Sequence, residues 1–195
     1  TLSIVVTNDG RDERHATASP TAFEELSPEQ LRELIGRGGI VGLGGAVFPT
    51  AAKLSSGSGA SGLRLLLNGA ECEPYISCDD MLMRERAHDV VFGARVLLHA
   101  LAASTCVIAI EDDTPQAAAA LGTAIAEAHD QRIQLRRVAS IYPAGGERQL
   151  ITAVFGVEVP AGGLPADVGA LCLNVGTAAA VAQWIRDAQP LTSRI

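Results

Sequence analysis

Three segments with the length and pattern of strands are each followed by residues with glycine, amide, hydroxyl or carboxylate groups. These residues are Asn68, Glu71 and Glu73 after the first segment, Gly145, Gly146 and Glu147 after the second, and Asn174 and Thr177 after the third. In open α/β sheets, ligands bind beyond the carboxyl ends of the strands. We therefore expect these residues to be able to line one polar site with little steric bulk.

A glycine-rich loop offers an anion-binding wall for such a site. The segment GLGGAVFPT contains Gly42, Gly44 and Gly45, and consecutive glycines let backbone N–H groups converge on a phosphate. Lys53 follows the loop by about one helical turn, where its ammonium group could reach the same ligand. The dinucleotide spacing G-x-G-x-x-G fails at Val47, and the loop follows a helix where that motif requires a strand. Alone, such a loop is more often an ordinary turn than a cofactor cradle.

Structural interpretations compete with the functional ones. Glu71 and Glu73 lie two residues apart, which suits a paired acid site and a solvated rim about equally. Asn68 and Asn174 could cap turns or the helices that follow them, and the glycines before Glu147 could serve only to start a helix. No histidine has a partner at metal-ligand spacing, and the four cysteines form no CxxC pair. The sequence therefore predicts no metal site.

Composition indicates a well-buried globular domain. The chain has 195 residues, 48 % of them hydrophobic, and a formal net charge of -7. This acidic balance leaves no broad basic face for a phosphate backbone, so a nucleic acid partner is not expected. No uninterrupted apolar stretch reaches the ~18 residues of a membrane span. We expect any association with a membrane to run through another subunit.

Strand and helix patterns alternate along the chain. The expected strands are residues 2–6, 63–67, 105–110, 132–138 and 170–173, and the expected helices are residues 28–35, 49–54, 81–102, 115–129, 147–155 and 177–187. Ser27, Pro28 and Gln30 predict a capping box at the first helix. Such an alternation predicts an α/β, Rossmann-like three-layer domain with a mostly parallel sheet of about four strands. We expect it to span residues 1–190, with residues 191–195 starting another domain.

Four motifs occur in the order seen in the RnfC family of bacterial Rnf electron-transport complexes. They are GIVGLGGAVFPT from Gly39 with Lys53, NGAECEPY from Asn68, YPAGGE from Tyr142, and NVGT from Asn174. The chain resembles the FMN- and NADH-binding domain of that family over almost its whole length. It is more distantly similar to the flavoprotein subunit of respiratory complex I. Four ordered motifs are far more specific than one.

This resemblance implies an NADH:FMN oxidoreductase domain, in which a hydride passes between NAD(H) and non-covalently held FMN without a protein nucleophile. The residues that it places around the cofactor are Gly42, Gly44, Gly45, Lys53, Asn68, Glu71, Gly145, Gly146, Asn174 and Thr177. Phe48 would stack on the dinucleotide, and Glu73 and Glu147 would lie near its nicotinamide. The family usually has glycine where this chain has Val47.

The resemblance also implies a setting for the domain. Its partners would be the other subunits of a membrane-bound, ion-translocating ferredoxin:NAD⁺ oxidoreductase, placed peripherally on the cytoplasmic face of the bacterial inner membrane and linked to ferredoxin. The iron-sulfur clusters of the family lie in a C-terminal part that this chain lacks, and residues 191–195 resemble the beginning of its ubiquitin-like domain. The complex I relatives carry arginine and aspartate where this chain has Leu43 and Ala70, so contacts of those groups are not expected.

Two other interpretations stay open at this stage. The flavin domain of cobalamin reductases of bacterial microcompartments is similar, and only the missing C-terminal sequence would separate it from the Rnf domain. Alternatively, the fold is kept as a non-catalytic docking scaffold with a degenerate cofactor site, as Val47 hints.

Overall fold

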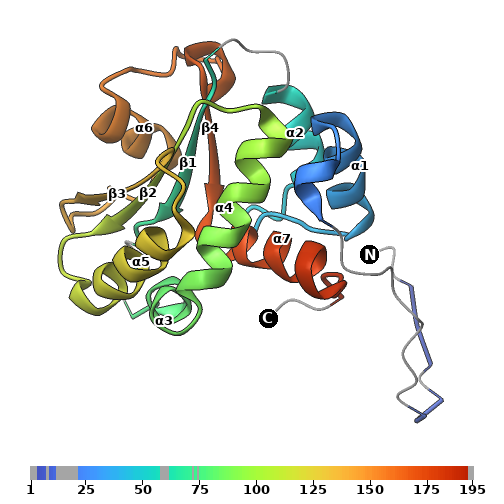
Figure 1. The fold of residues 1–195 in the computed structure, drawn as a ribbon. Coiled ribbons are helices and arrows are strands. Elements are labelled where there is room, and N and C mark those ends of the chain that lie inside the picture. Colours follow the sequence, from blue (N-terminus) through green and yellow to red (C-terminus); the bar gives the residue numbers. More distant parts are fainter. Residues whose placement is uncertain are drawn as a thin grey trace.

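A parallel sheet forms the centre of the molecule (Figure 1). The computed structural model describes residues 4–7, 9–11, 22–57, 62–71, 73 and 75–192. In this part of the chain, the sheet has four strands in the order β3-β2-β1-β4, and every neighbouring pair is parallel. The strands are β1 (Arg64–Gly69), β2 (Thr105–Glu111), β3 (Ile133–Val138) and β4 (Ala170–Asn174). The predicted α/β class with a parallel sheet is confirmed.

Helices cover the two faces of the sheet unequally. They are α1 (Pro28–Arg37), α2 (Thr50–Gly57), α3 (Cys78–Glu85), α4 (Ala87–Leu101), α5 (Pro115–Ala128), α6 (Glu147–Phe155) and α7 (Val175–Asp187), with short 3-10 helices η1 (Phe23–Glu25) and η2 (Pro165–Val168). The larger apolar core joins one face of the sheet to α1, α4, α5 and α7, and a smaller core joins the other face to α6. These layers match the predicted three-layer arrangement.

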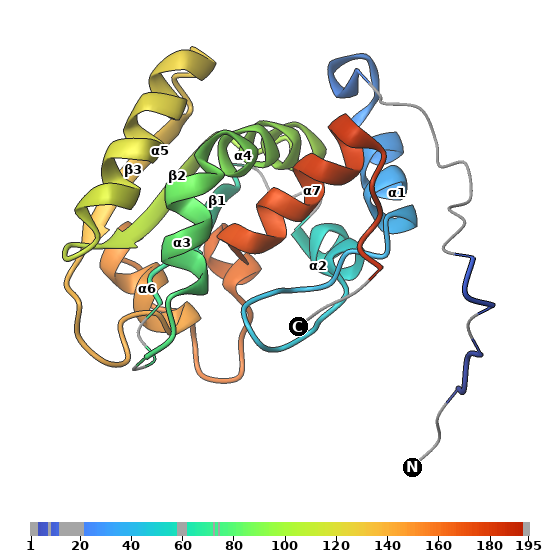
Figure 2. The same cartoon turned by 90° about the horizontal axis from the view of Figure 1, so that it is seen from below.

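Sheet register brings polar residues together at the carboxyl edge. Asn68 at the end of β1 is paired with Asn174 at the end of β4. Figure 2 looks at the molecule from below, toward this edge, with the glycine-rich loop beside the start of α7. Because all strands are parallel, the segments that follow them emerge on the same side, as the sequence predicted.

The expected single helix over residues 81–102 is wrong. Backbone angles of φ -131° and ψ 33° at Arg86 separate α3 from α4. The two helices differ in their main neighbour, since α3 packs mainly on α5 whereas α4 packs mainly on α7. A continuous apolar pattern does not reveal such a change of direction, because Met83 and Ala87 are buried on either side of the break.

The expected strand over residues 2–6 is also wrong for its described part. Ile4, Val5 and Val6 are exposed and belong to no strand, and residues 2 and 3 lie outside the described residues. An alternating pattern forms a strand only where a neighbouring strand accepts its hydrogen bonds.

Other boundaries differ by a few residues. Helix α2 continues to Gly57, and α7 begins at Val175, ahead of the expected Thr177. The capping box at the start of α1 is confirmed, with Gln30 N donating to Ser27 Oγ at 3.2 Å. Leu191 packs against the core, and its N–H donates to Gly38 O at 3.0 Å. The proposed division after residue 190 stays a prediction.

Helices α4 and α7 approach each other so closely that only glycine fits at residue 93. A Cβ atom there would lie 1.9 Å from the carbonyl oxygen of Ala178. We expect Gly93→Ala to lower the free energy of unfolding by roughly 3 kcal/mol or more, because backbone atoms must move apart. Gly122→Ala on the exposed side of α5 is the matched control, since nothing lies within 4 Å of its Cβ position. It should stabilise by roughly 0.5–1 kcal/mol. Urea unfolding measures both, and equal effects would contradict the close packing.

Candidate functional site

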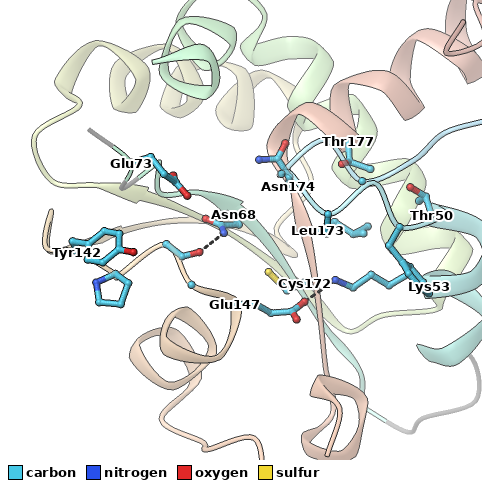
Figure 3. Close-up of a pocket in the computed structure, with 17 residues that line it drawn as sticks. Thr50, Lys53, Asn68, Glu73, Tyr142, Glu147, Cys172, Leu173, Asn174 and Thr177 are labelled. Carbon is cyan, nitrogen blue, oxygen red and sulfur yellow. Dashed lines mark hydrogen bonds and ion pairs between the residues drawn. The ribbon is translucent and has the colours of Figure 1, made fainter. Parts of the chain in front are cut away.

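A pocket of about 440 Å³ opens at the carboxyl edge of the sheet. Its walls come from the glycine-rich loop and the start of α2, the end of β1, the segment before α6, and the end of β4 with the start of α7 (Figure 3). The predicted site residues that line it are Gly42, Gly44, Phe48, Lys53, Asn68, Glu73, Gly145, Gly146, Glu147, Asn174 and Thr177. Gly45 and Glu71 do not line it. The fold therefore brings segments that are far apart in the sequence into one site.

The glycine-rich loop is fastened to the first turn of α7. Leu43 N donates to the Oγ1 atom of Thr177, which is fully buried, at 3.0 Å. Gly44 lies against Asn174, where an added Cβ atom would be 3.2 Å from the asparagine Cβ. The loop is also closed by Gly42 N, which donates to Phe48 O at 2.8 Å. Glycine at residue 44 thus permits a close approach that a larger residue would push apart.

The two asparagines hold the walls together. Asn68 Nδ2 donates to Gly145 O at 2.8 Å (Figure 3). Asn68 Oδ1 accepts from Ala70 N at 3.0 Å. Asn174 Oδ1 accepts from Gly176 N at 2.7 Å and caps α7. The capping and turn interpretations of these residues are confirmed. Both residues also line the pocket, so the structural and ligand-facing interpretations do not exclude each other.

An ion pair joins opposite walls of the pocket. Lys53 Nζ lies 2.6 Å from Glu147 Oε1, and the side chains are 30 % and 39 % exposed (Figure 3). Pairs this open to solvent contribute little to stability, roughly 0–1 kcal/mol. A ligand that offers an anionic oxygen to Lys53 can therefore replace Glu147 as its partner.

Glu71 and Glu73 differ in the groups that they contact. The Glu71 carboxylate accepts hydrogen bonds from the backbone N–H groups of Cys78 at 3.1 Å and Asp79 at 3.1 Å, so it holds the start of α3. The Cys78 thiol also donates to Glu71, which raises the pKa of this cysteine to about 11. Glu73 lines the pocket. Both acids also line a neighbouring pocket together with Glu111 and Asp113, so a paired role for them stays a prediction.

Asp79 is a carboxylate beside the site that the sequence did not single out. Its Oδ2 accepts from Asn174 Nδ2 at 2.5 Å, which links α3 to the start of α7. Burial raises the pKa of Asp79 to about 6, and the nearby charges of Glu71 and Glu73 add to the shift, whereas the Asn174 hydrogen bond opposes it. An aspartate in the first turn of a helix is ordinary in a sequence, so no local signal marked this contact.

Several lining residues were not among the predicted site residues, although most of them lie in the motifs that carried the prediction. They are Ala46, Thr50, Tyr142, Pro143, Cys172 and Leu173. Tyr142 and Pro143 belong to the YPAGGE motif, and Ala46 and Thr50 belong to the glycine-rich loop. Cys172 lies in a strand that was assigned to the core, and its burial raises its pKa to about 12, so the thiol stays protonated.

Fold and pocket define an α/β domain of the class that holds a polar ligand beyond the carboxyl ends of parallel strands. Residues 35–183 match the family model described as the Nuo51 FMN-binding domain. The chain belongs to this family of flavin-binding domains.

Relatives in the curated proteins are similar along the whole chain. The RnfC protein of the ion-translocating oxidoreductase complex of Vibrio cholerae is 44 % identical over 194 residues, which are 100 % of this chain and 25 % of the relative. The protein of the same name from Pseudomonas aeruginosa is 50 % identical over 194 residues, 99 % of this chain and 24 % of the relative. The chain thus spans about a quarter of the length of these relatives. The predicted resemblance to the RnfC family is confirmed.

A solved structure shares the fold. A chain of the NAD⁺-reducing [NiFe]-hydrogenase in the H₂-reduced state superposes with a TM-score of 0.72 at 24 % sequence identity, covering 84 % of this chain and 32 % of that chain. None of the helices in the described residues is long and apolar enough to cross a membrane.

The backbone strain at Val47, in the glycine-rich loop, can be tested directly. Its φ of +54° lies in the left-handed region, which strains a β-branched side chain. We expect Val47→Gly to stabilise the chain by roughly 0.5–1 kcal/mol, because relief of about 1–2 kcal/mol of strain outweighs the entropy of an added glycine. Val47→Ala, which keeps a Cβ atom, is the control. Urea unfolding in which the glycine variant is less stable than the alanine variant would disprove the strain.

Asp79 makes the stability of the domain depend on pH. Because its folded pKa of about 6 is raised from 3.8, the folded state holds the proton more tightly than the unfolded state. The contribution of Asp79 to the free energy of unfolding is present at low pH. It is lost as the pH rises from about 4 to about 6, by roughly 1.4 kcal/mol for each pH unit. Urea unfolding of the wild type and Asp79→Asn across this window should show the wild type losing stability relative to the variant. Parallel curves would argue against the raised pKa.

Proposed function

We propose that the pocket binds FMN and that the chain is the flavin domain of an ion-translocating oxidoreductase complex that exchanges electrons with NAD(H). One observation carries this proposal: four motifs that are far apart in the sequence form the walls of a single pocket. The family match and the similarity to RnfC relatives along the whole chain support the cofactor and the complex.

The residues present fit a mononucleotide with an anionic end. Lys53 supplies a cation in the wall, and Gly44 lets the loop approach Asn174 without an intervening side chain. Asn68, Gly145 and Gly146 form a low wall opposite the loop. This donor set suits the phosphate, ribityl hydroxyls and ring edge of FMN, and it contains no side chain positioned as a nucleophile.

When bound, FMN supplies the centre that accepts or donates a hydride opposite a nicotinamide. The protein's part is to position the reactants and to shape the electrostatics around them. Phe48 is 53 % exposed and Tyr142 is 77 % exposed, and both line the pocket, so they offer aromatic surface at its mouth. We place Phe48 against the dinucleotide, and Glu73 and Glu147 near its nicotinamide. Glu71 acts from outside the lining by holding the start of α3, and Gly45 is kept as a proposed contact of the cofactor.

The setting of the domain is part of the same proposal. We propose that its partners are the other subunits of an Rnf-type complex and a ferredoxin-linked chain, on the cytoplasmic face of a bacterial inner membrane. Iron-sulfur clusters in the remainder of a full-length protein would receive the electrons.

A flavin titration tests the function directly. The chain should quench FMN fluorescence on binding, and anaerobic NADH should bleach the flavin absorbance band of the complex. Binding without bleaching would contradict the NAD(H) assignment. Absence of FMN binding would reject the cofactor and favour the docking-scaffold interpretation.

Lys53 and Glu147 should have opposite effects on FMN affinity. We expect Lys53→Met to raise the FMN Kd by roughly tenfold or more, the value of one hydrogen bond to a charged group. Glu147→Gln should bind FMN as tightly as the wild type or more tightly, because it frees Lys53 from the ion pair. Glu127→Gln, which changes an exposed carboxylate of α5, is the control and should leave the FMN Kd unchanged. Equal losses in both pocket variants would mean that the pair only holds the walls together.

A further inference from the structure

Thr50 carries a hydroxyl group that the protein itself leaves without a partner. Thr50 is 1 % exposed, and its buried Oγ1 atom has no hydrogen-bond partner among the described residues. The residue lines the pocket. A buried hydroxyl without a hydrogen bond costs free energy, so such groups in native structures call for an explanation.

Local structure explains why Thr50 is unpartnered. Serine and threonine within helices usually donate to a carbonyl one turn earlier, as Ser56 Oγ does to Lys53 O at 2.8 Å in the same helix. Thr50 is the first residue of α2, and the turn before it is the glycine-rich loop. Nor does Thr50 cap the helix in the way that Ser27 caps α1, since Lys53 N donates to Pro49 O at 3.2 Å.

The position of Thr50 is nevertheless tightly held. Its backbone N–H donates to Ile40 O at 3.0 Å, and a bridge pairs Val41 with Pro49. Thr50 and Lys53 are three residues apart, which places both on one face of α2. Figure 3 shows the two side chains on the same side of the pocket. A rigidly placed hydroxyl beside an ammonium group suits a ligand oxygen that accepts a hydrogen bond.

We propose that the Thr50 hydroxyl donates a hydrogen bond to the ribityl-phosphate chain of FMN. This inference rests on the proposed function and adds a residue to the FMN site. The hydroxyl is then a binding group. Without FMN, its unmet hydrogen bond lowers the stability of the domain, and with FMN, the bond that it forms strengthens binding. A purely structural hydroxyl would have the opposite effect on the empty domain, since its removal would cost stability.

Two variants and a control separate these roles. Thr50→Val removes the hydroxyl and keeps the shape, Thr50→Ser keeps the hydroxyl, and Thr123→Val repeats the change on the exposed side of α5, where Thr123 Oγ1 donates to Ala119 O. The measurements are the urea midpoint without FMN and the FMN Kd by fluorescence quenching. We expect Thr50→Val to be at least as stable as the wild type without FMN and to raise the Kd about tenfold, the value of one hydrogen bond. Thr50→Ser should stay within about threefold of the wild type, and Thr123→Val should leave the Kd unchanged.

Riboflavin, which lacks the phosphate, shows which part of the chain accepts the bond. If Thr50→Val loses affinity for FMN alone, the acceptor is a phosphate oxygen. If it loses affinity for both flavins, the acceptor is a ribityl hydroxyl. Either result supports the proposal. The proposal is overturned if Thr50→Val binds FMN like the wild type, or if this variant is destabilised or unfolded without FMN. If the wild type itself binds no FMN, the proposed function fails, whereas a binding wild type with an equally binding Thr50→Val rejects the role of Thr50 alone.

Discussion

The hydrogen bond from Leu43 N–H to the buried hydroxyl of Thr177 is the contact on which the pocket depends. It joins residues 134 positions apart and holds the glycine-rich loop against the first turn of α7. Gly44 makes this approach possible, because a side chain there would press on Asn174. This contact fixes the loop near Leu43, whereas α2, which carries Lys53, is held by Leu54 in the larger core.

Most polar groups around the pocket have structural partners as well as access to it. Asn68 ties the end of β1 to Gly145, and Asn174 caps α7 while it holds Asp79. These bonds preorganise the walls, so a ligand meets groups that already have their orientation. Lys53 has an exchangeable partner in Glu147, and the Thr50 hydroxyl has none among the described residues. The site therefore combines fixed walls with a few groups that a ligand can engage.

Sequence patterns predicted the elements well where the pattern and the packing agree. The buried strands β1, β2 and β4 were predicted from apolar runs, the half-exposed edge strand β3 from its alternating pattern, and the capping box of α1 from Ser27 with Gln30. Patterns failed where a tertiary neighbour decides the outcome. Arg86 divides the expected helix over residues 81–102, since α3 packs mainly on α5 and α4 mainly on α7. Ile4 to Val6 have strand-like residues without a neighbouring strand.

The sequence by itself determined the family, the parallel sheet and most of the residues that line the pocket. The physical reason is that parallel strands all end at the same edge of the sheet, so the residues directly after them lie near one another whatever path the connecting segments take. Only the tertiary structure decided how those residues divide their roles. Glu73 lines the pocket whereas Glu71 holds α3, Lys53 pairs with Glu147, and Asp79 is buried with a raised pKa. Such contacts depend on distances between separate segments, and local spacing does not encode them.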